Sequence, residues 1–331
     1  MAEATPGLGP AARPQLPAGC SGEAAFTHLL RASAERLHET ARAFLAQNDP
    51  EPVHQLRVAL RRHRCLLKAF DPYLDREFVE SQGARAQDIA RRLSPVRELD
   101  VLAGETLPNL AAEFRREAEG EANARRVGAA HKIADGFDAL AKKLSSDAKR
   151  KRAALRRSDL GVEFGVLVLD LSKALADDSW RASAESRGKK AAQQGVKLLQ
   201  GEATKLVGPM LDRALKKMRL YGARIDDLTI EERHELRKKA KTLRYGVEFF
   251  GSLYDPAAVK DYRRALKQLQ KSFGALNDAA DALSLAQLQV EPALRPAIKA
   301  AVARSEEKMR AEFLIAAERW RDFEETARFW K

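Results

Sequence analysis

Residues 53–70, VHQLRVALRRHRCLLKAF, have the pattern of a helix with two different faces. At 100° per residue, five of the basic side chains of this stretch fall within an arc of about 80°. They are His54, Arg57, Arg61, Arg64 and Lys68. The opposite side carries Leu56, Leu60, His63, Leu67 and Phe70. The row of cations is about 21 Å long. Because like charges along one face repel each other, either water and salt screen the row or an anion binds along it.

The same pattern occurs a second time, in residues 233–250, RHELRKKAKTLRYGVEFF. Its cations repeat the spacing of the first row at an offset of 234 − 54 = 180 residues. They are His234, Arg237, Lys241 and Arg244. A second pair of segments, LSPVRE at 93–98 and FGALND at 273–278, keeps the same offset. The retained spacing predicts two related halves. Because the cationic side matches nearly as well as the apolar side, we expect the two rows to form one anion site.

The repeated helix, with the pattern H-x-L-R-x(3)-[RK]-x(2)-R, and the shorter matched segment resemble the CHAD family, the conserved histidine α-helical domain. The resemblance extends from about Ala24 to the C-terminus. It implies an all-α fold of two helical bundles related by an internal pseudo-twofold repeat. It also implies that a central basic surface binds inorganic polyphosphate without catalysis, in association with polyphosphate granules.

Position by position, the resemblance assigns polyphosphate contacts to the cations of both repeats. The assigned residues are His54, Arg57, Arg61, Arg64, His234, Arg237, Lys241 and Arg244. Lys68 extends the first row only, since Glu248 stands at the matching position of the second. Lys238 and Tyr245 flank the second row and are predicted to reach the ligand as well.

A linear polyphosphate suits such rows because guanidinium groups form charge-assisted, often bidentate bonds to phosphate oxygens. Binders of single-stranded nucleic acid combine basic and stacking residues. Here aromatic residues make up 6% of the chain, and Tyr245 alone stands beside a row. Sequence-independent binding of duplex nucleic acid remains an alternative, because phosphate contacts suffice for it. No helix-turn-helix or other readout motif predicts a specific nucleic-acid partner.

A third hypothesis is a metal-dependent or phosphate-processing enzyme that uses His54 and His234. No HExxH, paired-Asp or P-loop spacing accompanies these histidines. We therefore predict no catalytic residue, no metal ligand and no cofactor. His63 lies on the apolar side and is predicted to be a hydrogen-bonded core histidine. Arg97 is predicted to form an ion pair with Asp100.

The composition indicates a basic patch on an otherwise balanced surface. Lys and Arg number 59 against 47 Asp and Glu, a formal net charge of +12, which favours an anionic partner. The two cysteines, Cys20 and Cys65, are too few for a disulfide framework or a zinc site. The sequence has neither a secretory signal pattern nor an apolar run long enough to span a membrane. We therefore predict a cytoplasmic location and no membrane partner.

Two segments of biased composition divide the chain into a tail and two bundles. Residues 1–23 are rich in Pro, Gly and Ala and predict a disordered tail. The CHAD-like domain is predicted over 24–331, with an N-terminal bundle at 24–180 and a C-terminal bundle at 203–331. The Gly-, Ser- and Lys-rich residues 180–201 are predicted to join them.

Apolar periodicity and breaker residues predict the individual helices. They are expected over 24–47, 53–69, 75–92, 94–102, 104–158 with a break near Gly120, 159–180, 203–224, 229–250, 256–272, 276–289 and 292–330. Asp49 is expected to cap one helix, and Thr229 with Glu232 to form a capping box. Pro296 is expected to interrupt the last helix.

Overall fold

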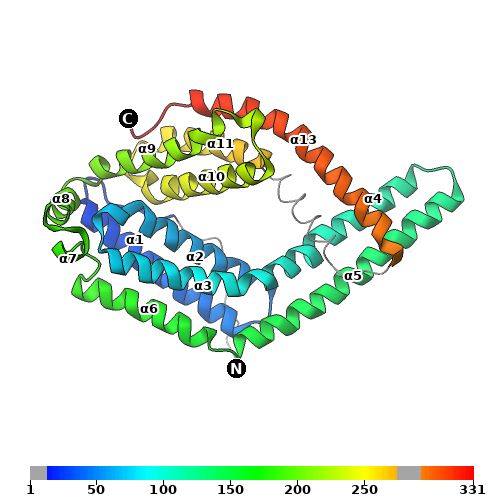
Figure 1. Cartoon of the computed structure of the whole chain (residues 1–331), viewed down its shortest axis with the longest axis horizontal. Coiled ribbons are helices and arrows are strands. Elements are labelled where there is room, and N and C mark those ends of the chain that lie inside the picture. The colour runs from blue at the N-terminus through cyan, green and yellow to red at the C-terminus, as the bar shows by residue number, and fades with distance from the viewer. Residues whose placement is uncertain (1–12, 274–291) are drawn as a thin grey trace.

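The structure is a computed structural model that describes residues 13–273 and 292–331 (Figure 1). In these ranges every regular element is helical, which confirms the all-α fold class. The N-terminal α-helices are α1 (Gly22–Ala46), α2 (Pro50–Phe70), α3 (Arg76–Val101), α4 (Leu107–Glu119), α5 (Ala124–Arg156) and α6 (Leu160–Asp177). The following ones are α7 (Ala184–Arg187), α8 (Lys189–Gln200), α9 (Ala203–Gly222), α10 (Ile230–Phe250), α11 (Pro256–Ser272) and α13 (Arg295–Glu325).

The two helices that carry the cationic rows begin and end at the residues that the sequence marks. α2 has prolines in its first turn, although Asp49 makes no capping hydrogen bond with its side chain. Proline fits there because the first N–H groups of a helix have no partner within it. α10 begins with the predicted capping box, in which Thr229 and Glu232 each bind the other's backbone N–H. The apolar sides of both helices are buried, as predicted.

α3 is a single helix, although we predicted two helices meeting at Pro95. A proline inside a helix removes one hydrogen bond and costs about 3 kcal/mol. The turns on both sides of it are buried, with Leu93 at 0% and Val96 at 2% exposure, and this packing keeps the helix continuous. Ser94 Oγ also donates to the Ala90 carbonyl oxygen at 2.9 Å, in the turn that precedes the proline.

α4 and α5 form a helical hairpin that extends away from the other helices (Figure 1). α4 ends at Glu119, and Gly120 interrupts the helical pattern there, as predicted. The apolar faces of the hairpin and the first turns of α13 form a core of their own, which includes Phe114, Phe137 and Ile298. α13 contains Pro296 in its first turn and continues past it, so the predicted interruption is wrong. The helix predicted over 276–289 lies outside the described residues.

The larger core is continuous through both predicted bundles. Phe70 of α2 packs against Phe26 of α1, with ring centroids 4.9 Å apart, and against Phe250 of α10 at 5.8 Å. Trp180 closes this cluster with its ring 4.8 Å from Phe26. Phe70 and Phe250 end the two cationic helices, so the aromatic cluster brings these helices together. The bundle boundaries and the internal repeat remain predictions.

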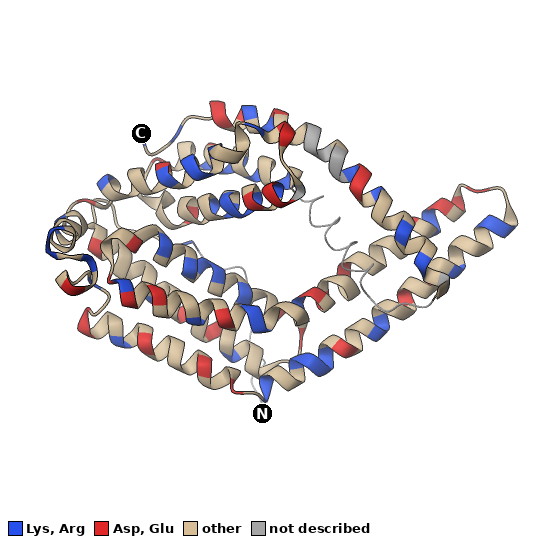
Figure 2. Cartoon of the chain, in the orientation of Figure 1, with Lys and Arg blue, Asp and Glu red and all other residues tan. Residues whose placement is uncertain are grey.

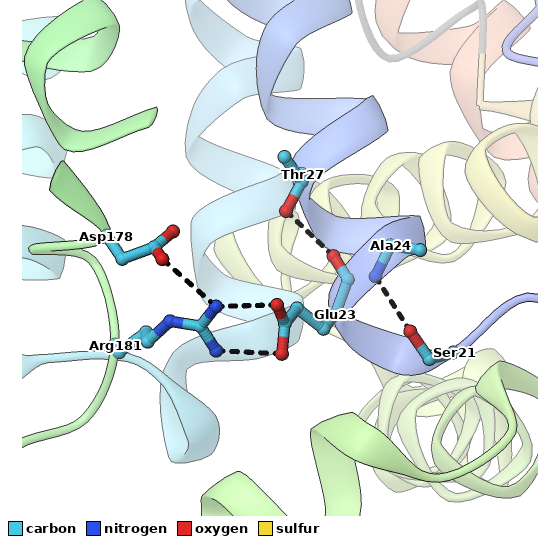
Figure 3. Close-up of polar contacts among 6 residues, drawn as sticks. All are labelled: Ser21, Glu23, Ala24, Thr27, Asp178 and Arg181. Atoms are coloured by element: carbon cyan, nitrogen blue, oxygen red, sulfur yellow. Dashed lines mark hydrogen bonds and ion pairs between the residues drawn. The ribbon is translucent and has the colours of Figure 1, made fainter. Parts of the chain in front are cut away.

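The start of α1 is anchored to the segment that follows α6 (Figure 3). Ser21 Oγ accepts a hydrogen bond from the Ala24 N–H at 3.1 Å and so caps the helix. Arg181 donates to both carboxylate oxygens of Glu23, at 2.5 and 2.7 Å, and also to Asp178 at 3.1 Å. These bonds lower the pKa of Glu23. The segment that joins the predicted bundles is thereby tied to the first helix.

The last residues of the predicted 1–23 tail pack against the core. Leu16 is 5% exposed, and its N–H donates to Ser252 Oγ at 2.9 Å, just after α10. Burial of this leucine fixes the chain ahead of α1, so the expectation of disorder is wrong for residues 13–21. Residues 1–12 lie outside the described part of the chain. In the part that is described, no helix combines the length and apolar character needed to cross a bilayer.

We expect Gly222→Ala to lower the free energy of unfolding by about 1.5 kcal/mol through overpacking. A Cβ at this position would lie 2.0 Å from the Trp320 ring, which is 3% exposed and has no room to move. Gly83→Ala is the control, because nothing lies within 4 Å of its added Cβ. Helix propensity should make that variant slightly more stable. Urea denaturation that finds equal stability for both variants would contradict this account of the α9–α13 contact.

Candidate anion-binding site

α2 and α10 contact each other through Phe70 and Phe250 at their C-terminal ends and through an ion pair. Arg62 of α2 donates to Glu248 Oε2 of α10 at 2.5 Å, and both side chains are 16% exposed. The guanidinium group of Arg62 also lies 5.6 Å from the ring centroid of Tyr245. Figure 2 shows Lys and Arg along both of these helices. The two cationic rows therefore lie on neighbouring elements.

A cavity of about 760 Å³ lies between α2, α9 and α10. Its basic lining residues are Arg61, Arg64, Lys68, Arg213, Lys217, His234, Arg237, Lys238, Lys239 and Lys241. Its floor includes apolar side chains such as Met210, Leu211 and Phe250. None of the described residues that line it is acidic. A low-dielectric floor beneath like charges strengthens the local positive potential.

The cavity brings together most of the predicted ligand residues, but three of them do not line it. Arg57 donates to the Ala90 carbonyl oxygen and to Ser94 Oγ, each at 2.6 Å. It therefore joins α2 to α3. His54 lies one turn earlier, and its pKa is lowered first by burial and then by the charge of Arg97. These two residues extend the row beyond the cavity.

Arg244, the third exception, covers the face of Tyr245 instead. Its guanidinium carbon lies 5.1 Å from the ring centroid, and its Nε lies 3.4 Å from Glu248 Oε1. Tyr245 lines the cavity but is only 2% exposed, between the guanidinium groups of Arg62 and Arg244. It therefore forms part of the cavity wall. Among the predicted residues, Lys238 is exposed and pairs with Glu235 at 2.6 Å.

Several cations at the cavity form no ion pair with a carboxylate within the described residues. They are Arg61, Lys68, Arg213, Lys217 and Lys241. Arginines elsewhere in the fold are commonly paired, as Arg85 is with Glu163 at 3.3 Å. Uncompensated cations around one cavity cost folding free energy and favour the binding of an anion.

Lys241 shows that the two rows meet electrostatically. Its pKa falls to about 7, mainly because burial disfavours the charged form. The charges of Arg237, Arg61 and Arg244 lower it further, and Arg61 belongs to α2. The pKa of His234 is also lowered, by burial and then by its cationic neighbours on α10. A bound anion would reverse these shifts, because it stabilises the protonated forms.

The sequence profile of the CHAD domain matches residues 28–287, which are 287 − 28 + 1 = 260 of the 331 residues. The chain belongs to the CHAD family. The CHAD domain from the plant Ricinus communis has a similar crystal structure, with a TM-score of 0.68 and 23% identity over 96% of each chain. PptA from Streptomyces chartreusis is similar with a TM-score of 0.61 and 16% identity, covering 91% of this chain and 99% of that one. At these identities the likeness shows a shared fold. No curated protein matches the chain.

The structure of this CHAD protein adds basic residues that the sequence analysis missed. Arg213 and Lys217 reach the cavity from α9, and Lys239 does so from α10. The apolar periodicity of residues 203–224 predicts a helix but assigns no ligand residue to it. The sequence signal for Arg213 and Lys217 is their spacing of four residues, which places both on one face of the helix. The repeated cationic pattern did not reveal Arg213 and Lys217 because that pattern lies in α2 and α10.

One predicted structural role near the CHAD site needs correction. Arg97 pairs with Glu105 at 3.1 Å, whereas Asp100 is buried in a pair with Arg152 of α5. The predicted Arg97–Asp100 pair is wrong because the Asp100 carboxylate faces α5 and binds Arg152. His63 is fully buried and hydrogen-bonded as predicted, with Nδ1 3.0 Å from Ser33 Oγ. Its Nε2 has no hydrogen-bond partner among the described residues.

Neither candidate catalytic histidine of this CHAD chain lies in a cluster with metal-binding geometry. Within residues 13–273 and 292–331, no group of three or more His, Cys, Asp or Glu side chains is placed to hold a metal ion. His234 lines the cavity and His54 does not. The absence of metal and of catalysis remains a prediction.

Proposed function

We propose that this CHAD protein binds inorganic polyphosphate in the cavity between α2, α9 and α10, without hydrolysing it. The observation that carries the proposal is the set of cations around this cavity that have no carboxylate partner in residues 13–273 and 292–331. A polyphosphate would supply the missing negative charge at short intervals. The family resemblance drawn from the two repeated helices points to the same ligand.

The size and lining of the cavity favour a flexible inorganic chain over nucleic acid. A volume of about 760 Å³ admits a single chain of phosphates but cannot enclose a duplex. The aromatic residues of the lining are mostly buried, with Tyr245 at 2%, Phe249 at 5% and Phe250 at 0% exposure. These three rings cannot serve as stacking platforms for bases, and Tyr221 is the one half-buried aromatic residue among the described lining residues. Phosphate contacts alone would then provide the affinity.

Competition between two polyanions tests this choice of ligand. Fluorescently labelled long-chain polyphosphate is titrated with the protein, and unlabelled competitors are added at equal phosphate concentration. We expect unlabelled polyphosphate to displace the probe and short duplex DNA to leave most of it bound. The affinity should also fall steeply with salt, because binding releases several counterions. Equal displacement by duplex DNA would favour the nucleic-acid alternative.

The non-catalytic part of the proposal has a separate test. Pure protein is incubated with polyphosphate and Mg²⁺ or Mn²⁺, and released phosphate is measured over hours. We expect no release above the buffer control, because the described residues of the cavity lining include no carboxylate to activate water or to hold a metal. Release that depends on His234 would support the enzyme alternative. A cytoplasmic location, predicted from the sequence pattern, and recruitment to polyphosphate granules, implied by the family resemblance, are further parts of this proposal.

A further inference from the structure

α9 brings a third group of cations to the cavity, in addition to the rows on α2 and α10. Arg213 and Lys217 are one helical turn apart on α9, and both line the cavity. Both side chains are exposed, and neither forms an ion pair with a carboxylate in the described part of the chain. Residues spaced by four lie on the same face of a helix. α9 therefore presents an unpaired cationic face to the same space as α2 and α10.

Asp212 and Arg219 of α9 hold the C-terminal part of the chain in place. Asp212 accepts a hydrogen bond from Trp330 Nε1 at 3.0 Å and pairs with Arg328 at 3.2 Å. Arg219 pairs with Glu324 of α13 at 3.0 Å. Asp212 and Arg219 are thus paired with the C-terminal segment, whereas Arg213 and Lys217 line the cavity. Within the described residues, neither of these two cations has a carboxylate partner that would explain its charge.

This third group has no equivalent in the first half of the chain. At the offset of 180 residues, Arg213 corresponds to Ser33 and Lys217 to Leu37. Leu37 is fully buried in α1, and Ser33 is hydrogen-bonded to His63. A site formed only by the repeated helices would be lined with cations on two sides. The presence of α9 makes this site three-sided and asymmetric.

We propose that Arg213 and Lys217 are ligand-binding residues and that α9 forms the third side of the polyphosphate site. The inference rests on the proposed function of the cavity. Each phosphate inside a chain carries free oxygens that point in different directions, so cations on one side cannot contact all of them. A third cationic wall contacts oxygens that face away from α2 and α10. Each added cation also releases further counterions.

The double variant Arg213→Gln/Lys217→Gln tests this role by polyphosphate titration at several salt concentrations. We expect about tenfold weaker binding at low salt, the combined effect of two exposed charge contacts. The dependence of log Kd on log salt should also become shallower by about one to two, because fewer counterions are released. Far-UV circular dichroism and the thermal midpoint should match the wild type, since both side chains are exposed.

The matched control is Lys205→Gln/Lys216→Gln, which removes the same charge from exposed positions of α9 that do not line the cavity. Lys216 points about 100° away from Lys217 around the helix. We expect the control to bind within about twofold of the wild type, with an unchanged salt slope. If the cavity double variant also binds like the wild type, α9 is not part of the site. A wild-type protein that binds no polyphosphate would instead overturn the proposed function itself.

Discussion

Reversing the charges of Arg61 and Lys241 together is expected to weaken polyphosphate binding by about a thousandfold, or about 4 kcal/mol. Arg61 reaches the cavity from α2 and Lys241 from α10, and neither pairs with a carboxylate among the described residues. Each reversal replaces an attraction to phosphate by a repulsion, worth about 2 kcal/mol at a partly shielded site. Titration of Arg61→Glu/Lys241→Glu with labelled polyphosphate measures the loss.

The control for the double reversal is Arg150→Glu/Lys216→Glu, which changes the net charge equally at exposed positions away from the cavity. Its binding should weaken by less than about tenfold through the long-range field alone. Both variants should keep the helical circular dichroism spectrum, because the reversed side chains are outside the apolar core. Equal losses for the two variants would show that overall charge, and not this cavity, governs binding.

Lys241→Met is expected to make the protein more stable and its polyphosphate binding weaker. The pKa of Lys241 is about 7 in the folded protein, far below the value of about 10.4 in an unfolded chain. At pH 7 and below, the folded state therefore bears the cost of a half-buried cation beside Arg237 and Arg61. After an allowance for solvent screening, removing it should add about 1 kcal/mol of stability and raise Tm by about 3 °C. The affinity should fall about fivefold, because neutralising this cation removes its attraction to phosphate without adding a repulsion.

The pH dependence separates the two effects of Lys241. Between pH 7 and about 10, the unfolded chain keeps a proton on Lys241 that the folded chain releases, so wild-type stability gains a contribution that rises with pH. Lys241→Met lacks this contribution. Polyphosphate raises the pKa of Lys241 when it binds, so wild-type affinity should increase as the pH falls from 8 to 6. Calorimetric titrations that give the same pH dependence for both proteins would show that Lys241 does not take up the proton.

The sequence predicted the cationic helices well because local chemistry determines them. The capping box at Thr229 and the prolines before Val53 mark the helix starts. These local features require no contact with residues that are distant in sequence. The helical period then separates the apolar and cationic sides of α2 and α10. The prediction that a helix ends at Pro95 was wrong for the opposite reason. Its local cost is outweighed by burial of the turns around it, which depends on helices distant in sequence.

The site itself was predicted in part, since a row of cations does not show which side chains are already bound within the protein. Arg57 belongs to the same cationic row as Arg61, yet it donates hydrogen bonds to α3 and does not line the cavity. Arg244 belongs to the same cationic row as Lys241, yet its guanidinium group covers the Tyr245 ring and does not line the cavity. The α9 cations lie outside the repeat, and only the packing of α9 against α10 brings them to the cavity. Spacing identifies candidates, and tertiary packing selects among them.

The central claim is that cations from α2 and α10 share one cavity and hold a phosphate chain there. A crystal structure of the protein with polyphosphate tests it most directly. The account predicts phosphate density between α2, α9 and α10, with oxygens about 2.7–2.9 Å from Arg61 and Lys241 nitrogens. Density that instead follows the exposed basic face of α5 around Arg150, with the cavity free of phosphate, would contradict it.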